Sequence, residues 1–133
     1  MGVALDTTLF VDLARRRANA LAKIDELDSR RDAKVIPSPV AYEILHGILA
    51  AKSMTQAALF RGWIARFHVV PLDLAAAERA SMIRTELGRL GRVKGAVDIL
   101  AAGIALAGNH SLVTRDTDFR AIASATGLSI EPY

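Results

Sequence analysis

The stretch SLVTRDTDF, residues 111–119, combines a short apolar run with two aspartates. The apolar pair at 112–113 is typical of a buried strand, and the run ends at Thr114, just before Asp116 and Asp118. Acidic side chains that follow a core strand either cap the next helix or line a site at the end of a sheet. The rest of the sequence helps to decide which of these two roles Asp116 and Asp118 have.

Short apolar runs alternate with segments of helical periodicity along the whole chain. Apolar residues recur at helical spacing between these runs, for example at Ala80, Ile83 and Leu87. This alternation predicts an α/β fold with helices on both faces of a mostly parallel sheet, and we expect four to five short strands and about seven helices. We expect one domain over residues 1–133. The predicted strands are residues 3–5, 34–36, 68–72, 111–114 and 128–130.

The composition excludes several functional classes. The chain has no cysteine, which rules out a disulfide framework, a thiolate zinc site and a cysteine nucleophile. The N-terminal segment lacks a basic region and reaches Asp6 too early for a signal peptide. No uninterrupted apolar run approaches the roughly 18 residues that a membrane span needs. We therefore expect a cytoplasmic protein without a membrane partner. The net charge of +3 is compatible with a polyanionic partner.

Four acidic residues stand where a parallel sheet gathers its ligands. Asp6 and Asp116 follow predicted strands, and Glu43 and Asp98 lie early in predicted helices that come after strands or their loops. Each also has a simpler explanation: Asp6 and Asp116 suit helix N-caps, Glu43 suits a half-exposed helix face, and Asp98 suits the positive end of a helix dipole. Because the carboxyl ends of parallel strands meet at one edge, all four can face the same cleft.

Two of these acids have small neighbours on their own helix face. Glu43 has Gly47 one turn away, and Asp98 is flanked by Gly95 and Ala102. A glycine inside a helix costs up to about 1 kcal/mol relative to alanine, which indicates that the space beside Glu43 matters. Asp98 also opens the most apolar helical segment of the chain. We therefore expect both carboxylates to point into open space.

Several carboxylates in one cleft require a counter-charge. They repel one another and would partly protonate, and a hard divalent cation removes this conflict. Carboxylates together with water suit Mg²⁺ or Mn²⁺. An acidic cluster on a basic protein is a common arrangement for metal-assisted cleavage of phosphodiester bonds.

Four segments resemble the PIN-domain ribonucleases, and VapC-type toxins of toxin–antitoxin modules in particular. The match runs nearly end to end and preserves the order of the motifs. The segments are LDTTLFVDLARRR, IPSPVAYEILHGI, GAVDILAAGIALAGNHSLVTRDTDF and the closing GLSIEPY. The resemblance implies a PIN-like α/β/α sandwich.

The resemblance also implies roles for individual residues. Thr7 resembles the small hydroxyl residue after the first aspartate, and Thr114 the strand-end threonine that orders the site. Asp118 resembles an additional acid in the family's Asp-Phe pair. The family usually has asparagine where this chain has Thr8, so no firm role is assigned there. The residues implied as metal ligands and catalytic residues are Asp6, Glu43, Asp98 and Asp116.

The implied activity is Mg²⁺- or Mn²⁺-dependent endoribonuclease cleavage of tRNA, rRNA or mRNA. The implied partners are a small VapB-like antitoxin and a second copy of the chain in a homodimer. Apolar stripes in residues 19–30 and 56–67 offer surfaces for an antitoxin helix, although burial in the core explains them equally well. The glycine-containing run RTELGRLGRVKG, residues 84–95, is expected to form in part a mobile loop at the cleft. Candidate contacts to RNA phosphates are Arg92, Lys94, Arg115 and Arg120.

Three other functions are compatible with parts of the sequence. A PIN-domain nuclease for RNA processing, without an antitoxin, would have the same site. A PIN domain that binds RNA without cutting it would have lost acids that are present here. A Mg²⁺-binding phospho-receiver module would need a lone aspartate after the middle strand and a lysine after the last strand. Asp73 meets the first condition, but the final strand leads only to residues 131–133.

Overall fold

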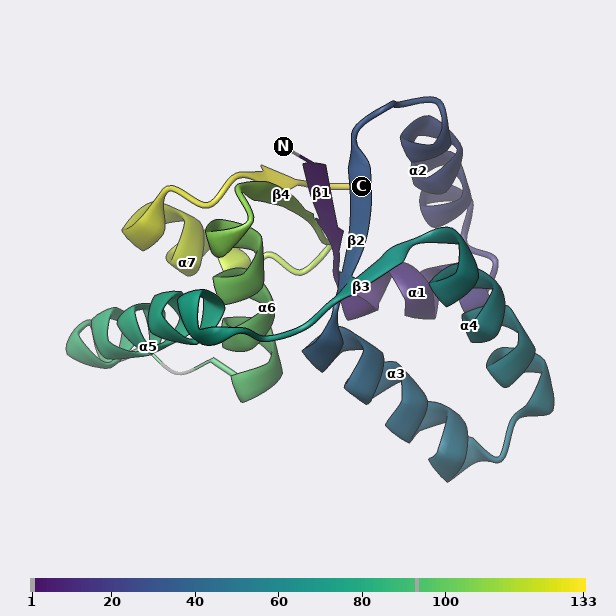
Figure 1. The fold of residues 1–133 in the computed structure, drawn as a ribbon, viewed down its shortest axis with the longest axis horizontal. Helices are drawn as coiled ribbons and strands as arrows, with labels where there is room; N and C mark the ends of the chain where they lie inside the picture. Colours follow the sequence, from purple (N-terminus) through teal and green to yellow (C-terminus); the bar gives the residue numbers. More distant parts are fainter. Residues whose placement is uncertain (1, 93) are drawn as a thin grey trace.

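The centre of the fold is a parallel β-sheet (Figure 1). In the computed structural model, which describes residues 2–92 and 94–133, the strand order is β3-β2-β1-β4-β5. Every neighbouring pair of strands is parallel. The strands are β1 Gly2–Leu5, β2 Ala33–Pro37, β3 His68–Val70, β4 His110–Val113 and β5 Ile130–Glu131. The predicted parallel sheet is confirmed, and each predicted strand overlaps an observed one.

Helices cover both faces of this sheet. Figure 1 shows α1 to α4 on one side of the strands and α5 to α7 on the other. The described residues form seven helices, as predicted, so the chain is an α/β/α sandwich. Their bounds are α1 Thr7–Ala14, α2 Ala18–Asp28, α3 Ser38–Ala51, α4 Met54–Arg66, α5 Leu74–Arg89, α6 Ala96–Ala107 and α7 Phe119–Thr126. In this part of the chain, no helix is both long enough and apolar enough to span a bilayer.

The period-two alternation of strand side chains builds two apolar cores, one on each face. Val3 and Leu5 of β1 pack into a cluster with residues of α1 and α2, while Ala4 packs into a second cluster with residues of α5, α6 and α7. β1 is buried throughout, since strands cover both of its edges and helices cover both of its faces. The backbone at the end of β1 is therefore held rigidly, and so is the starting point of the side chains that follow it.

Local sequence signals account for most boundaries. α3 begins at Ser38 and carries Pro39 in its first turn, where a missing backbone N–H costs nothing. β3 ends before Pro71, two residues earlier than predicted, because proline cannot donate to the strand ladder. The run 84–95 is helical through Arg89, so the expected loop begins only at Leu90. The prediction of mobility there covers Val93, which lies outside the described residues.

The structure gives Asp73 a role that does not fit a phospho-receiver module. The Asp73 carboxylate accepts a hydrogen bond from the Ala76 backbone N–H at 2.9 Å and so caps α5. The preceding strand, β3, lies at the edge of the sheet instead of at its centre. Asp73 is thus a helix cap on an edge connection, and the receiver alternative is not supported.

The sheet has its switch in strand order at β1 and β4. From β1 the chain proceeds outward through β2 to β3 on one side, and it then returns to β4 on the other side. The two strands end together, since the Asp6 backbone N–H donates to the Val113 carbonyl at 3.1 Å. Open α/β sheets bind ligands beyond the carboxyl ends of strands at such a point.

Candidate active site at the carboxyl ends of β1 and β4

Asp6 is the buried centre of this region, with 2% of its surface exposed. Its Oδ2 atom accepts hydrogen bonds from Thr114 Oγ1 at 2.7 Å and from Thr8 Oγ1 at 3.2 Å. Burial raises the pKa of Asp6, the hydroxyl groups oppose this shift, and the nearby charge of Asp98 adds to it. A carboxylate with these surroundings gains from a cation beside it.

Thr114 connects the ends of the two central strands. Its hydroxyl donates to Asp6 and also accepts from the Asp116 backbone N–H at 3.0 Å. Thr8 Oγ1 lies 3.3 Å from Thr114 Oγ1, and the Arg115 backbone N–H donates to Thr8 at 3.4 Å. The threonine that stands where the family usually has asparagine is therefore part of the same network. Its shorter side chain still reaches Asp6.

The two carboxylate oxygens of Asp116 have different partners. Its Oδ1 atom accepts from the Asp118 backbone N–H at 2.9 Å, which stabilises the turn before α7. Its Oδ2 atom faces Lys94 Nζ at 3.1 Å. Asp118 occupies the N-cap position of α7 without a side-chain cap bond, and its carboxylate lies 3.9 Å from the same ammonium.

Lys94 lies among the aspartates of the site. Its Nζ atom is 2.9 Å from Asp98 Oδ2 and 3.1 Å from Asp116 Oδ2. It also lies 4.7 Å from the centre of the Phe119 ring. Burial alone would lower the pKa of Lys94, but hydrogen bonds to the two carboxylates and their charges outweigh burial and raise it. The ammonium therefore stays protonated and holds the start of α6 against the loop after β4.

Glu43 belongs to a separate part of the cleft. Its Oε1 atom accepts a hydrogen bond from Thr7 Oγ1 at 2.6 Å, so the residue after Asp6 links Glu43 to the strand end. Glu43 is exposed and, with Gly47, lines a groove of about 240 Å³ between α1 and α3. A Cβ atom at Gly47 would meet nothing within 4 Å, so the space expected beside Glu43 is present.

The four predicted acids do not form a closed chelating cluster. Within residues 2–92 and 94–133, no group of three or more His, Cys, Asp or Glu side chains is arranged to hold a metal ion. Instead, the charge of Asp98 contributes to the raised pKa of Asp6, Asp116 pairs with Lys94, and Glu43 pairs with Thr7. Mg²⁺ commonly binds through one or two carboxylates and keeps several waters. The all-oxygen donor set around Asp6 and Asp98 fits such an ion.

One buried carboxylate was not identified from the sequence. Asp12 of α1 has no exposed surface and accepts hydrogen bonds from Arg115 Nε at 2.6 Å and from Tyr133 Oη at 2.9 Å. Arg17 Nε lies 3.5 Å away. These contacts fix Arg115, between Thr114 and Asp116, and tie the C-terminal residue to the site. The only sequence signal was an acid on the apolar side of the first helix, at i+3 from Leu9.

The candidate phosphate contacts fall into two groups. Lys94 and Arg115 are paired with carboxylates, as described above, which makes them less suited to bind phosphate than the sequence indicated. Arg92 and Arg120 are exposed, and no ion pair links either of them to another described residue. Both line a pocket of about 470 Å³ that Lys94 and Asp118 also border. RNA contacts at Arg92 and Arg120 stay a prediction.

Comparison with known proteins shows the family of the chain. The family model described as PIN domain matches residues 3–125. The chain belongs to the PIN-domain family. This PIN domain is 31% identical to the tRNA(fMet)-specific endonuclease VapC of Shigella flexneri, over 97% of the chain and 96% of that protein. The resemblance to VapC-type PIN domains that the sequence motifs indicated is confirmed.

Solved structures show the same fold. VapBC2 from Rickettsia felis, bound to a DNA fragment from its promoter, matches this PIN domain with a TM-score of 0.85 and 22% identity. That match covers 100% of this chain and 99% of the other. DNA-bound VapBC from Salmonella typhimurium matches with a TM-score of 0.80 and 27% identity, over 99% and 98% of the two chains. The predicted PIN-like sandwich is thus confirmed.

Thr114→Val tests whether the threonine orders the site. Valine keeps the shape of threonine but removes the hydroxyl that joins Asp6 to the Asp116 backbone. We expect RNA cleavage to fall by about 10- to 100-fold, as for other groups that orient a metal ligand. Thr85→Val, on the exposed face of α5, is the matched control and should cleave at the wild-type rate. Equal cleavage rates for the two variants would show that the Thr114 hydroxyl does not order the site.

Proposed function

We propose that this protein is a Mg²⁺- or Mn²⁺-dependent endoribonuclease and the toxin of a toxin–antitoxin pair. The observation that carries the proposal is the pair of carboxylates, Asp6 and Asp98, at the switch point of a VapC-type PIN domain. Its relative in Shigella flexneri is named for cleavage of tRNA(fMet), so tRNA is the first substrate class to test. The RNA-processing alternative without an antitoxin shares the site, but the structural neighbours include VapBC complexes.

Asp6 and Asp98 are the residues that would hold the ion, with Asp116 beside them. When bound, a divalent ion activates water and stabilises negative charge on the attacking and leaving oxygens of a phosphodiester. Thr114 and Thr8 fix the orientation of the Asp6 carboxylate by donating to its Oδ2 atom. The Thr7 backbone N–H also donates to the Asp6 carboxylate, so donors of this chain hold it in one orientation before substrate arrives.

The RNA backbone would approach the site along the pocket before α7. Arg92 and Arg120 line this pocket, and Asp118 and Lys94 lie at its border with the carboxylates. Arginine forks suit phosphate oxygens, and contacts to phosphates position RNA without reading its sequence. These two arginines would therefore supply affinity for the RNA backbone.

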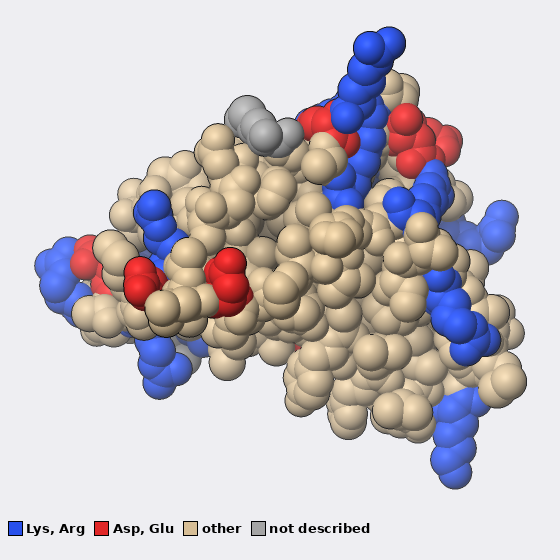
Figure 2. Space-filling model, viewed as in Figure 1, with Lys and Arg blue, Asp and Glu red and all other residues tan. Residues whose placement is uncertain are grey.

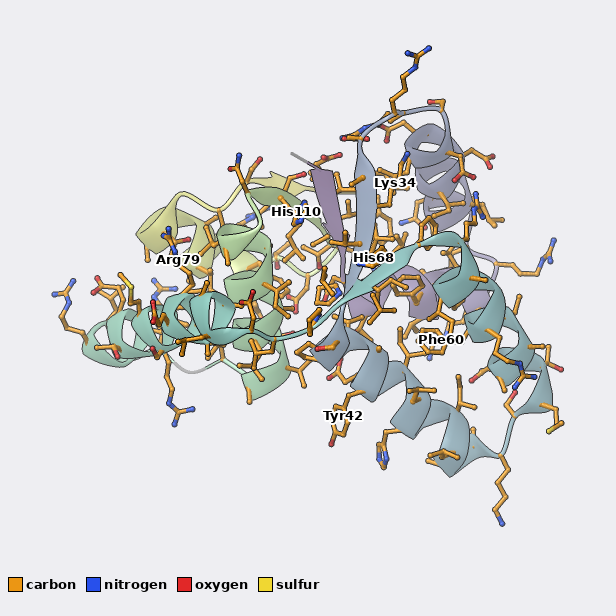
Figure 3. All side chains as sticks on the ribbon, viewed as in Figure 1. Lys34, Tyr42, Phe60, His68, Arg79 and His110 are labelled. Atoms are coloured by element: carbon orange, nitrogen blue, oxygen red, sulfur yellow. The ribbon has the colours of Figure 1, made fainter. Side chains whose placement is uncertain are left out.

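The antitoxin would cover the groove between α1 and α3. Phe10, Val11 and Ile44 line this groove, and Glu43 lies at its wall. Figure 2 shows few charged side chains over α3, and Figure 3 shows Tyr42 pointing away from that helix. Tyr42 is 65% exposed and Leu49 is 74% exposed. An amphipathic segment placed in this groove would contact Phe10, Val11 and Ile44 and cover Glu43, while Tyr42 and Leu49 lie on α3 outside the groove lining.

The two apolar stripes considered for antitoxin docking differ in how much of their surface is exposed. Ile24 and Leu27 of the stripe in residues 19–30, and Phe60 of the stripe in 56–67, are core residues. Leu59 and Ile64 of the second stripe are partly exposed. The α2 stripe is thus mainly core, while α4 can still contribute to a docking surface. A homodimer, as the family resemblance implied, is also part of this proposal.

Removal of metal is the direct test of the proposed activity. The protein, purified free of antitoxin, is incubated with bulk tRNA in EDTA, in Mg²⁺ and in Mn²⁺. We expect discrete RNA fragments with either ion and none in EDTA, because the ion would supply the activated water and the stabilisation of negative charge on the phosphodiester oxygens. Addition of the antitoxin should abolish cleavage. Equal cleavage in EDTA would contradict the metal requirement, and intact tRNA and total RNA under all conditions would contradict the nuclease function.

A further inference from the structure

The position of Lys94 is not explained by RNA binding or by a metal site alone. Its ammonium lies within 4.0 Å of three carboxylates, those of Asp98, Asp116 and Asp118. Only 11% of its side chain is exposed, although lysine is normally a solvated residue. A lysine buried at the centre of a proposed catalytic cluster acts on the charge of that cluster.

Lys94 neutralises one side of the cluster and leaves the other side without a cation. Across the described residues, its ion pairs are all with the α6 start and the loop after β4, and Asp6 is not among its partners. The side-chain hydrogen bonds to Asp6 come from the hydroxyl groups of Thr114 and Thr8. Among the described residues, Asp6 is therefore the acid of the cluster that has no ion pair, and the like charge of Asp98 adds to the rise in its pKa.

We propose that Lys94 is a built-in cation that occupies the Asp98–Asp116 side of the cluster. As a result, the protein binds a single divalent ion, between Asp6 and Asp98. This inference rests on the proposed metal-dependent function and specifies how many ions that function uses. Three contacts hold the ammonium in place: Asp98 Oδ2 at 2.9 Å, Asp116 Oδ2 at 3.1 Å and the centre of the Phe119 ring at 4.7 Å.

A variant without the Lys94 charge should bind metal differently from the wild-type protein. Lys94→Met keeps the length and apolar stem of the side chain but leaves Asp98, Asp116 and Asp118 without a counter-charge. Three carboxylates with no cation repel one another and favour a hard divalent ion. The variant should therefore gain a second ion site that lysine fills in the wild-type protein.

The test counts bound ions in the absence of RNA. Mn²⁺ is titrated by calorimetry into the metal-free wild-type protein, Lys94→Met and the control Lys52→Met. Lys52 follows the C-terminal end of α3, is exposed and carries the same charge. We expect one ion per chain for the wild type and for the control, and two for Lys94→Met. The midpoint of thermal unfolding of Lys94→Met should also be lower in EDTA and rise more with Mn²⁺ than that of the wild type.

If Lys94→Met does not fold without metal, bound Mn²⁺ is counted by equilibrium dialysis of protein folded in Mn²⁺, together with Lys94→Gln. One ion in wild type and variants alike, or two ions in the wild type, would overturn the role of Lys94 and leave the proposed function standing. Binding of no ion by any of the proteins would instead contradict the metal-dependent function. The two failures are therefore distinguishable.

Discussion

Asp6→Asn is expected to reduce RNA cleavage about a thousandfold, since a bound ion contributes several kcal/mol of charge stabilisation in the transition state and each 1.36 kcal/mol is tenfold in rate. Asparagine keeps the shape of the aspartate and can still accept from Thr114 and Thr8, but it is a poor ligand for a hard cation. Cleavage of tRNA under single-turnover conditions measures the effect. A rate within tenfold of wild type would exclude Asp6 as a metal ligand.

The same variant should not lose stability in EDTA. Burial raises the pKa of Asp6 above 3.8, so the ionised carboxylate is less favourable in the fold than in the unfolded chain. The stability that Asp6 contributes therefore falls as the pH rises from about 3.8 through its folded pKa. Asparagine carries no charge, and the unfolding midpoint at neutral pH should match or exceed that of the wild type. A marked loss of stability would show that the ionised Asp6 carboxylate stabilises the fold.

Asp12→Ala is expected to destabilise the protein by about 1.5–3 kcal/mol, the range for hydrogen bonds to a charged group. The change removes a carboxylate with no exposed surface and leaves Arg115 and Tyr133 without their partner. Thermal unfolding should show a midpoint about 10 °C lower. Asp25→Ala, on the exposed face of α2, is the control and should leave the midpoint unchanged. An equal midpoint for the two variants would contradict this role.

The lowered pKa of Asp12 also makes the stability of the protein depend on pH. Burial by itself would raise the pKa of Asp12, but hydrogen bonds from Arg115 and Tyr133, with the charge of Arg115, outweigh burial and lower it. Its contribution to stability is therefore fully present above about pH 3.8 and is lost as the pH falls through the lower folded pKa. The difference in stability between wild type and Asp12→Ala should shrink over that acidic range. A constant difference would show that the charge of Asp12 is not involved.

The fold could be predicted because its signals are local. Short strands, helical stripes and a proline at a helix start each occupy a few neighbouring residues, and the rule for parallel sheets then places Asp6 and Asp116 at one edge. Asp98 was identified as a candidate in the same way, from its position in the first turn of the most apolar helix. These inferences needed no knowledge of which side chains touch.

The partners of the charged side chains could not be predicted, because they depend on packing between distant segments. Asp12 and Tyr133 are 121 residues apart and meet only when the C-terminus returns to α1. Lys94 was predicted as a candidate contact to RNA phosphate in a basic run, and its burial depends on how the loop before α6 packs against Phe119. A lysine or arginine has the same local pattern whether it faces a phosphate or an aspartate.

Single-turnover cleavage of tRNA in Mn²⁺ by the wild type, Asp98→Asn and Asp25→Asn tests the central claim most directly. Each variant loses one carboxylate, but Asp98 lies beside Asp6 at the switch point, whereas Asp25 lies on the exposed face of α2. The account predicts wild-type cleavage by Asp25→Asn and a loss of about a thousandfold for Asp98→Asn. Cleavage by Asp98→Asn at the wild-type rate would contradict a catalytic site at the carboxyl ends of β1 and β4.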